Sequence, residues 1–189
     1  MKNSKLVLVI FLSFFLLNNI SNAKDGPSEL INSIVNEASL VLKSSDPVES
    51  KIIKLNDIAE RSVDINGIGM YALGKHKKTM SEDQKIKYNK LFRSYFLKSF
   101  SSRLVDYTDP KINVISQKKI NEKYTIVNSI LEATSKRPQV KIDWRIYTKN
   151  QDKPLIRDLI VEGLSLARTQ KEEFNSVIQN NDGELNALF

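Results

Sequence analysis

The sequence predicts an α+β fold in which a bundle of helices packs on one face of a four-stranded, mainly antiparallel, curved sheet, with an apolar cavity between the two layers. Apolar residues recur about every 3.6 positions as far as Tyr107, alternate between residues 112 and 164, and then return to helical spacing. Strict alternation is typical of a sheet with one packed and one wet face. We therefore expect the helices to cover the packed face.

The first 23 residues have the composition of a secretory signal peptide. Lys2 and Lys5 precede an apolar run from Leu6 to Leu17, and Ser21-Asn22-Ala23 places small residues at a cleavage site. The run is shorter than the roughly 20 residues that span a bilayer. We expect residues 1–23 to be removed, and residues 24–189 to form a single exported domain.

Charge and cysteine content narrow the function classes. The formal net charge is +7, of which the signal peptide carries two charges, and cysteine is absent. An exported, moderately basic chain favours anionic lipid headgroups or an acidic protein over nucleic acid as partner. The lack of cysteine excludes disulfides, thiol chemistry and a lipid anchor on an N-terminal cysteine.

Three long helices are predicted before the sheet. The first begins at Pro27, and the second has Asp46 as its N-cap and Pro47 as its first residue. The longest opens with a capping box of Ser81 and Gln84 and runs to about Tyr107. Its buried stripe is expected to comprise Tyr88, Leu91, Phe92, Tyr95, Phe96, Phe100 and Leu104.

Four strands are predicted to follow, at residues 112–117, 124–133, 140–148 and 155–164. In the third strand, Val140, Ile142, Trp144 and Ile146 share one face. A last helix is indicated by the spacing of Leu166, Phe174, Val177 and Ile178.

The run Gly67 to Ala72 has the G-x-G-x-x-A spelling of a dinucleotide-binding turn. Such a turn follows a buried strand and has an acidic residue roughly 20 positions further on. Here the glycines follow a helix, and the position that should be acidic falls near Arg93 in the long helix. We expect a short helix instead, capped by Asp64, whose glycines allow close approach to its neighbours.

No catalytic or metal site is predicted. His76 is the only histidine and lies in a basic turn, and cysteine is absent. A catalytic triad or a zinc site would therefore have too few of its usual residues. The best enzyme hypothesis is an exported hydrolase that uses Asp143, Asp158 and Glu162 as carboxylates. Alternation with apolar residues favours a solvent-facing role for these three side chains.

Two segments, 64–107 and 140–189, resemble the MlaC family, also known as the toluene-tolerance auxiliary family. The resemblance lies in Ala72-Leu73-Gly74 followed by a basic residue, in the S-x-x-Q-opened aromatic helix, and in Asp158 with Val161 to Ser165. The chain departs from the family pattern at His76 and Lys77, where aromatic residues are frequent, at Phe100, and at Arg168 to Gln170.

The resemblance implies a fold that is NTF2-like in part and a monomeric periplasmic carrier of glycerophospholipid. Its partners would be an outer-membrane lipoprotein complex with a porin and an inner-membrane ABC transporter with a hexameric substrate-binding ring. The carrier would maintain outer-membrane lipid asymmetry without cofactor or covalent chemistry.

Lipid contacts are expected from the short helix, the long helix and the strands. The expected residues are Tyr71, Leu73, Phe92, Tyr95, Phe96, Phe100, Leu104, Val127, Leu131, Ile142, Trp144, Leu159 and Val161. Lys75 and Lys141 match basic positions of the family and are expected to contact the headgroup or a partner. Two alternatives stay open: the exported hydrolase, and a periplasmic interaction protein whose helix–sheet boundary is only core.

Overall fold

The structure is a computed structural model that describes residues 26–135 and 137–189. The predicted signal peptide, residues 1–23, lies outside these residues. In the described part of the chain, five strands form one antiparallel sheet in chain order. They are β1 (Ile112–Asn121), β2 (Tyr124–Leu131), β3 (Val140–Tyr147), β4 (Leu155–Val161) and β5 (Leu164–Ser165). The α+β prediction is confirmed.

The sheet has one strand more than predicted. The strand expected over 155–164 ends at Val161, where Glu162 and Gly163 both take positive φ angles, 50° and 85°. This turn folds the chain back so that Ser165 pairs with Ile160. A two-residue strand is too short to leave an alternation of its own in the sequence.

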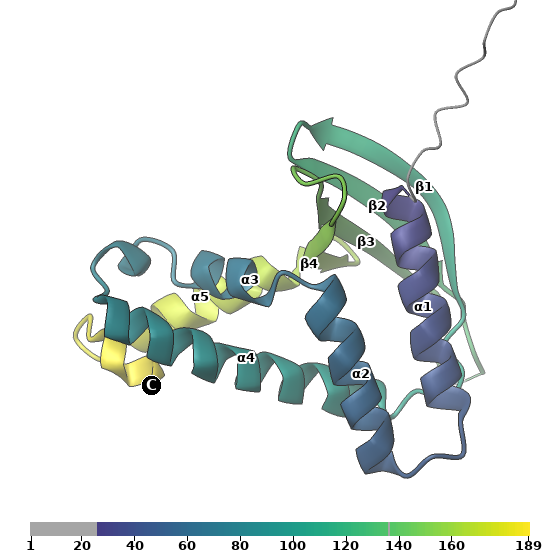
Figure 1. The fold of residues 1–189 in the computed structure, drawn as a ribbon, viewed down its shortest axis with the longest axis horizontal. Helices are drawn as coiled ribbons and strands as arrows, with labels where there is room; N and C mark the ends of the chain where they lie inside the picture. Colours follow the sequence, from purple (N-terminus) through teal and green to yellow (C-terminus); the bar gives the residue numbers. More distant parts are fainter. Residues whose placement is uncertain (1–25, 136) are drawn as a thin grey trace, which may run out of the picture.

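The helices surround the sheet on one side and extend beyond it. They are α1 (Pro27–Lys43), α2 (Val48–Ser62), α3 (Ile65–Ala72), α4 (Glu82–Leu104) and α5 (Leu166–Gln179), with 3₁₀ turns η1 (His76–Lys78) and η2 (Leu185–Leu188). In Figure 1, α1 lies along the concave side of the curved sheet, whereas α3, α4 and α5 project away from it. The core is therefore divided between two regions of the molecule.

Most of the predicted helix starts are confirmed by their caps. The Asp64 carboxylate accepts a hydrogen bond from the backbone N–H of Gly67 at 2.8 Å, and Ser81 and Gln84 form the reciprocal capping box. The start of α2 was wrong by one position. Pro47 occupies the N-cap, and the Asp46 carboxylate instead accepts from Lys54 Nζ at 2.6 Å, which lowers the pKa of Asp46.

One face of the sheet, called the inner face below, packs against α1. Val127 lies opposite Trp144 across β2 and β3, and both belong to a cluster that Ile31 of α1 completes. Val127 and Ile31 have no exposed surface. This sheet cluster fixes α1 on the sheet.

Two further apolar clusters lie among the helices. The first joins α3, α4 and α5 and includes Leu73 and Phe92. The second joins α1 and α2 around Leu55 and includes the last turns of α4. Val63, between α2 and α3, packs against both the sheet cluster and the α3–α5 cluster. Val63 therefore lies where the apolar core of the sheet meets that of the helices.

Candidate functional site

A row of aromatic rings runs along α4 from one helical cluster to the other. The rings of Phe92 and Phe96 have centroids 6.3 Å apart, and those of Phe96 and Phe100 stack at 6.0 Å with planes 9° apart. Phe92 is buried in the α3–α5 cluster, while Phe100 packs with Leu104 against the α1–α2 cluster. Phe96 and Phe100 are only half-buried. The row therefore offers apolar surface between the two clusters.

The predicted stripe on α4 was wrong at two of its positions. Leu91 and Tyr95 are 40% and 46% exposed. The buried and half-buried aromatic rings of α4, at positions 88, 92, 96 and 100, follow a four-residue spacing, and positions 91 and 95 lie one residue off that row, which turns them toward solvent. The Tyr95 hydroxyl donates to Gln170 Oε1 at 2.9 Å on this outer side.

The structure brings the six predicted strand residues onto the inner face. Strand register places Leu159 opposite Trp144 and Val161 opposite Ile142, with the same parity as Val127 on β2. The six residues on this face are Val127, Leu131, Ile142, Trp144, Leu159 and Val161. Val127 and Ile142 are buried, whereas the other four keep part of their apolar surface accessible. Hence half-buried apolar side chains occur on the inner face as well as on α4.

The predicted residues of α3 lie apart from the sheet. Leu73 has no exposed surface and belongs to the α3–α5 cluster. Tyr71 is 44% exposed, with Lys171 Nζ 5.3 Å from its ring centroid. Lys75 is exposed. It belongs to the turn after α3, and α3 lies at the projecting helical end (Figure 1). Their lipid contacts stay predictions.

Lys141 lies on the outer face of the sheet, opposite to the inner-face residue Ile142 that follows it. Its Nζ is 3.5 Å from the Asp143 carboxylate. Lys141 borders a hollow of about 200 Å³ with Ile115 and Ile130. The structure therefore does not bring Lys75 and Lys141 to a common mouth, and their headgroup role stays a prediction.

The three carboxylates of the hydrolase hypothesis serve structural contacts. Asp158 was expected to face solvent but is 3% exposed, because the segment that begins α5 folds over its carboxylate. It accepts from Ser165 Oγ at 2.6 Å and from the Ala167 backbone N–H at 3.0 Å. Asp158 is thus a buried helix cap.

The other two carboxylates tie neighbouring strands together. Asp143 accepts from Asn128 Nδ2 at 2.7 Å. Glu162 accepts from the backbone N–H of Lys141. Among the described residues, no group of histidine and carboxylate side chains is placed to hold a metal ion. The described part of the chain also contains no helix with the length and hydropathy of a membrane span.

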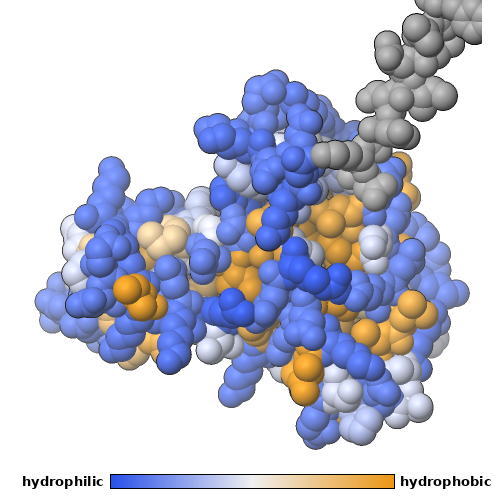
Figure 2. Space-filling view, viewed as in Figure 1, coloured by the Kyte–Doolittle hydropathy of each residue, from blue (hydrophilic) through white to orange (hydrophobic). Residues whose placement is uncertain are grey.

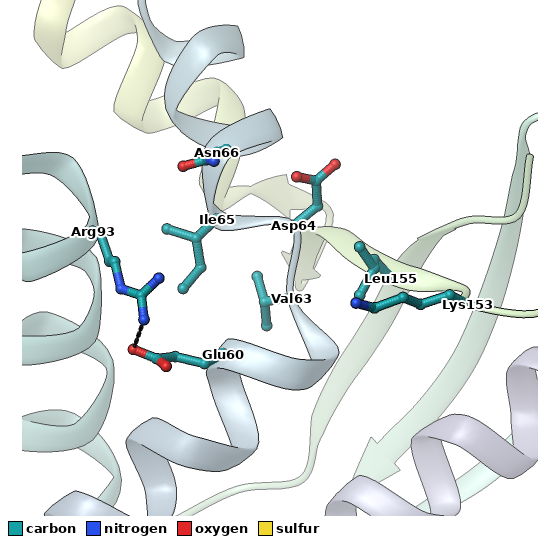
Figure 3. A pocket seen from close by; sticks show the side chains of 8 residues that line it. All are labelled: Glu60, Val63, Asp64, Ile65, Asn66, Arg93, Lys153 and Leu155. Carbon is teal, nitrogen blue, oxygen red and sulfur yellow. Dashed lines mark ion pairs between the residues drawn. The ribbon is translucent and has the colours of Figure 1, made fainter. Parts of the chain in front are cut away.

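A hollow of about 150 Å³ lies where α2, α3, α4 and the β3–β4 turn meet (Figure 3). Val63 and Ile65 form its floor, whereas most of its lining is polar or charged. The lining residues are Glu60, Val63, Asp64, Ile65, Asn66, Arg93, Lys153 and Leu155. They come from three separated stretches of sequence, and no periodicity links them, so sequence reasoning missed this hollow.

An ion-pair network fixes the junction behind this hollow. Arg157 donates to the Asp64 carboxylate through Nε at 2.7 Å and Nη2 at 2.6 Å, and to the Tyr124 hydroxyl at 3.1 Å. Burial alone would lower the pKa of Arg157, but the bonds to Tyr124 and Asp64 raise it. The carboxylate that caps α3 is therefore also fastened to β4.

These features define an α+β protein in which half-buried apolar side chains line the boundary between a curved sheet and a helical layer. The family model described as MlaC protein matches residues 31–189. The chain belongs to the MlaC family, which confirms the resemblance seen in its sequence.

Among solved structures, the fold is similar to that of a phospholipid-binding protein from Ralstonia solanacearum, determined in complex with a phospholipid. The two chains are 17% identical with a TM-score of 0.72, over 85% of this chain and 91% of that one. Comparison with curated proteins gave no significant match.

Proposed function

We propose that this protein is a periplasmic carrier that holds a glycerophospholipid by its acyl chains and moves it between an outer-membrane complex and an inner-membrane ABC transporter. The observation that carries the proposal is the half-buried apolar surface on the inner face and on α4, in a member of the MlaC family. The phospholipid bound by the Ralstonia solanacearum protein of similar fold supports the same ligand class.

Binding energetics favour an enclosed site for the chains. Two acyl chains carry about 30 methylenes, each worth ~0.8 kcal/mol on transfer from water, or roughly 20 kcal/mol together. The hollows of about 150 and 200 Å³ are smaller than the roughly 300–1,000 Å³ of ordinary small-molecule sites. We therefore propose that the helices move apart from the sheet when lipid is taken up.

The position of the hydrophobic surface agrees with this arrangement. In Figure 2, hydrophobic residues are concentrated at the centre and on the side of α1 and the sheet, and the projecting helical end is mostly hydrophilic. Lipid chains held between the layers would be shielded from water during transit, and a polar exterior keeps the loaded carrier soluble.

The proposal includes the cellular setting as well as the ligand. The carrier would be exported by the signal peptide and act as a monomer. It would exchange lipid with an outer-membrane lipoprotein–porin complex and with the hexameric ring of an ABC transporter, and so maintain outer-membrane asymmetry. A hydrolase is less well supported, because the Asp158 carboxylate is used by Ser165 and Ala167.

A vesicle transfer assay tests the carrier function. Residues 24–189 would be incubated with donor vesicles that contain fluorescent phosphatidylglycerol and with unlabelled acceptor vesicles separated by a protein-permeable membrane. We expect transfer that rises in proportion to protein concentration. Transfer no faster than with an equal mass of an unrelated protein, such as lysozyme, would contradict the proposal. Release of fatty acid would favour the hydrolase.

A further inference from the structure

We propose that the hollow between α2, α3 and α4 is the mouth of the lipid site, and that Arg93 and Lys153 on its rim bind the phosphodiester of the lipid headgroup. This inference rests on the proposed function. It concerns where the lipid enters and which groups recognise its phosphate.

The floor of the hollow leads into the apolar boundary of the fold. Val63 and Ile65 line it, and Leu155 of β4 lies at its side (Figure 3). Val63 packs against both the sheet cluster and the α3–α5 cluster. An acyl chain that passes Val63 therefore reaches the place where the two clusters meet.

The rim carries the opposite chemistry. Arg93 of α4 and Lys153 of the β3–β4 turn approach the hollow from opposite sides (Figure 3). An amphiphile with apolar chains and an anionic group at their junction matches an apolar floor beneath a cationic rim. A free phosphate ion would gain nothing from Val63 and Ile65, which favours a lipid phosphate as the ligand.

The charge balance leaves the rim positive. Arg93 Nη2 pairs with Glu60 at 2.5 Å, and the Asp64 carboxylate is held by Arg157. Lys153 has no carboxylate within 4.0 Å among the residues that the structure describes. The guanidinium of Arg93 keeps further N–H donors beyond the one that Glu60 uses. The rim therefore offers two cations that line one hollow, and a phosphodiester is a ligand for such groups.

A competition between two lipids tests the proposal. Residues 24–189 would be equilibrated with vesicles that contain dioleoyl phosphatidylglycerol and dioleoylglycerol in equal amounts, and the protein-bound lipids quantified by mass spectrometry. Because both lipids have the same chains, their bound ratio reports the contribution of the phosphoglycerol headgroup, and the variants below isolate the part that the two cations supply. For the unaltered protein we expect about tenfold enrichment of the phospholipid, the effect of one or two charge-assisted hydrogen bonds.

The variants R93Q with K153Q, and K153Q alone, should lower this ratio toward one while total bound lipid is retained. K153Q leaves the Arg93–Glu60 pair intact. The matched control is K98Q with K118Q, which removes two exposed lysines from α4 and β1 and should keep the enrichment. An unchanged ratio in K153Q and in the double variant, or no enrichment in the unaltered protein, overturns the rim assignment.

Two further results are equally decisive. If the unaltered protein binds neither lipid, the proposed function fails and the mouth fails with it. If millimolar glycerol 3-phosphate abolishes the enrichment, the rim is a site for a soluble phosphate ester and the lipid assignment is wrong. We expect no effect of glycerol 3-phosphate, because it lacks chains to occupy the floor.

Discussion

Gly69 of α3 and Phe92 of α4 are packed so closely that a Cβ atom at Gly69 would lie 2.7 Å from Cδ1 of the phenyl ring. The Gly69 carbonyl also accepts a hydrogen bond from the Tyr88 hydroxyl at 2.9 Å. The glycine that gave the sequence a nucleotide-binding spelling therefore serves helix–helix packing. It brings α3 onto the row of aromatic rings.

Gly69→Ala should lower the free energy of unfolding by about 1–3 kcal/mol, because the buried Phe92 ring cannot move away without disturbing its neighbours. Urea denaturation of residues 24–189 measures this change. Asn66→Ala, at an exposed position of the same helix, should alter stability by less than about 0.5 kcal/mol. A Gly69→Ala protein as stable as the parent would show that the two helices are not in close contact.

Asp158→Ala should destabilise the protein by roughly 3 kcal/mol, because the Ser165 hydroxyl and the Ala167 N–H lose their buried acceptor. The control is Glu122→Ala, which removes an exposed ion pair with Lys119 and should change stability by less than about 1 kcal/mol. Equal effects of the two substitutions in denaturant titrations would contradict the capping role of Asp158.

The free energy of unfolding should fall at alkaline pH because of Tyr88. Burial raises the pKa of Tyr88 above its ordinary value. Above about pH 10 the unfolded chain releases this proton while the folded chain keeps it, so stability falls as pH rises, by up to about 1.4 kcal/mol per pH unit.

Tyr88→Phe should remove this part of the pH dependence, although loss of the bond to Gly69 costs about 1 kcal/mol at neutral pH. Unfolding free energies at pH 8 and pH 11 separate the two effects. The gap between parent and variant should narrow at pH 11, and a gap that stays constant would show that Tyr88 ionises in the folded protein.

Much of the fold could be predicted from periodicity and caps. The capping box of α4, the switch from helical to alternating spacing and the shared face of Ile142, Trp144 and Ile146 are local properties of the sequence, and the structure agrees with them. Asp158 was misjudged because alternation assigns a residue to a face of the sheet but does not show that β5 and the start of α5 fold back over that residue.

The hollow at Val63 was beyond the reach of sequence reasoning for a different reason. Its rim pairs Arg93 with Lys153, sixty positions apart, and only the crossing of α4 near the β3–β4 turn brings them together. Periodicity predicts which face of an element is buried, but it carries no information on which elements meet.

Phe96→Asp should abolish lipid retention, because the side chain is half-buried between two aromatic neighbours and a carboxylate there would oppose acyl-chain binding. Leu91→Asp, at an exposed position of the same helix, should retain lipid. Bound phospholipid is measured after solvent extraction, with circular dichroism to check folding. Equal retention by both folded variants would show that the row of rings does not line the site.

The most direct test of lipid carriage is native mass spectrometry of the protein purified from the bacterial periplasm without detergent. We expect a folded species heavier than the mature chain by the mass of one phospholipid, and the loss of that mass after denaturation in organic solvent. Repeated recovery of a folded protein that carries no lipid, even after incubation with phospholipid vesicles, would contradict the account.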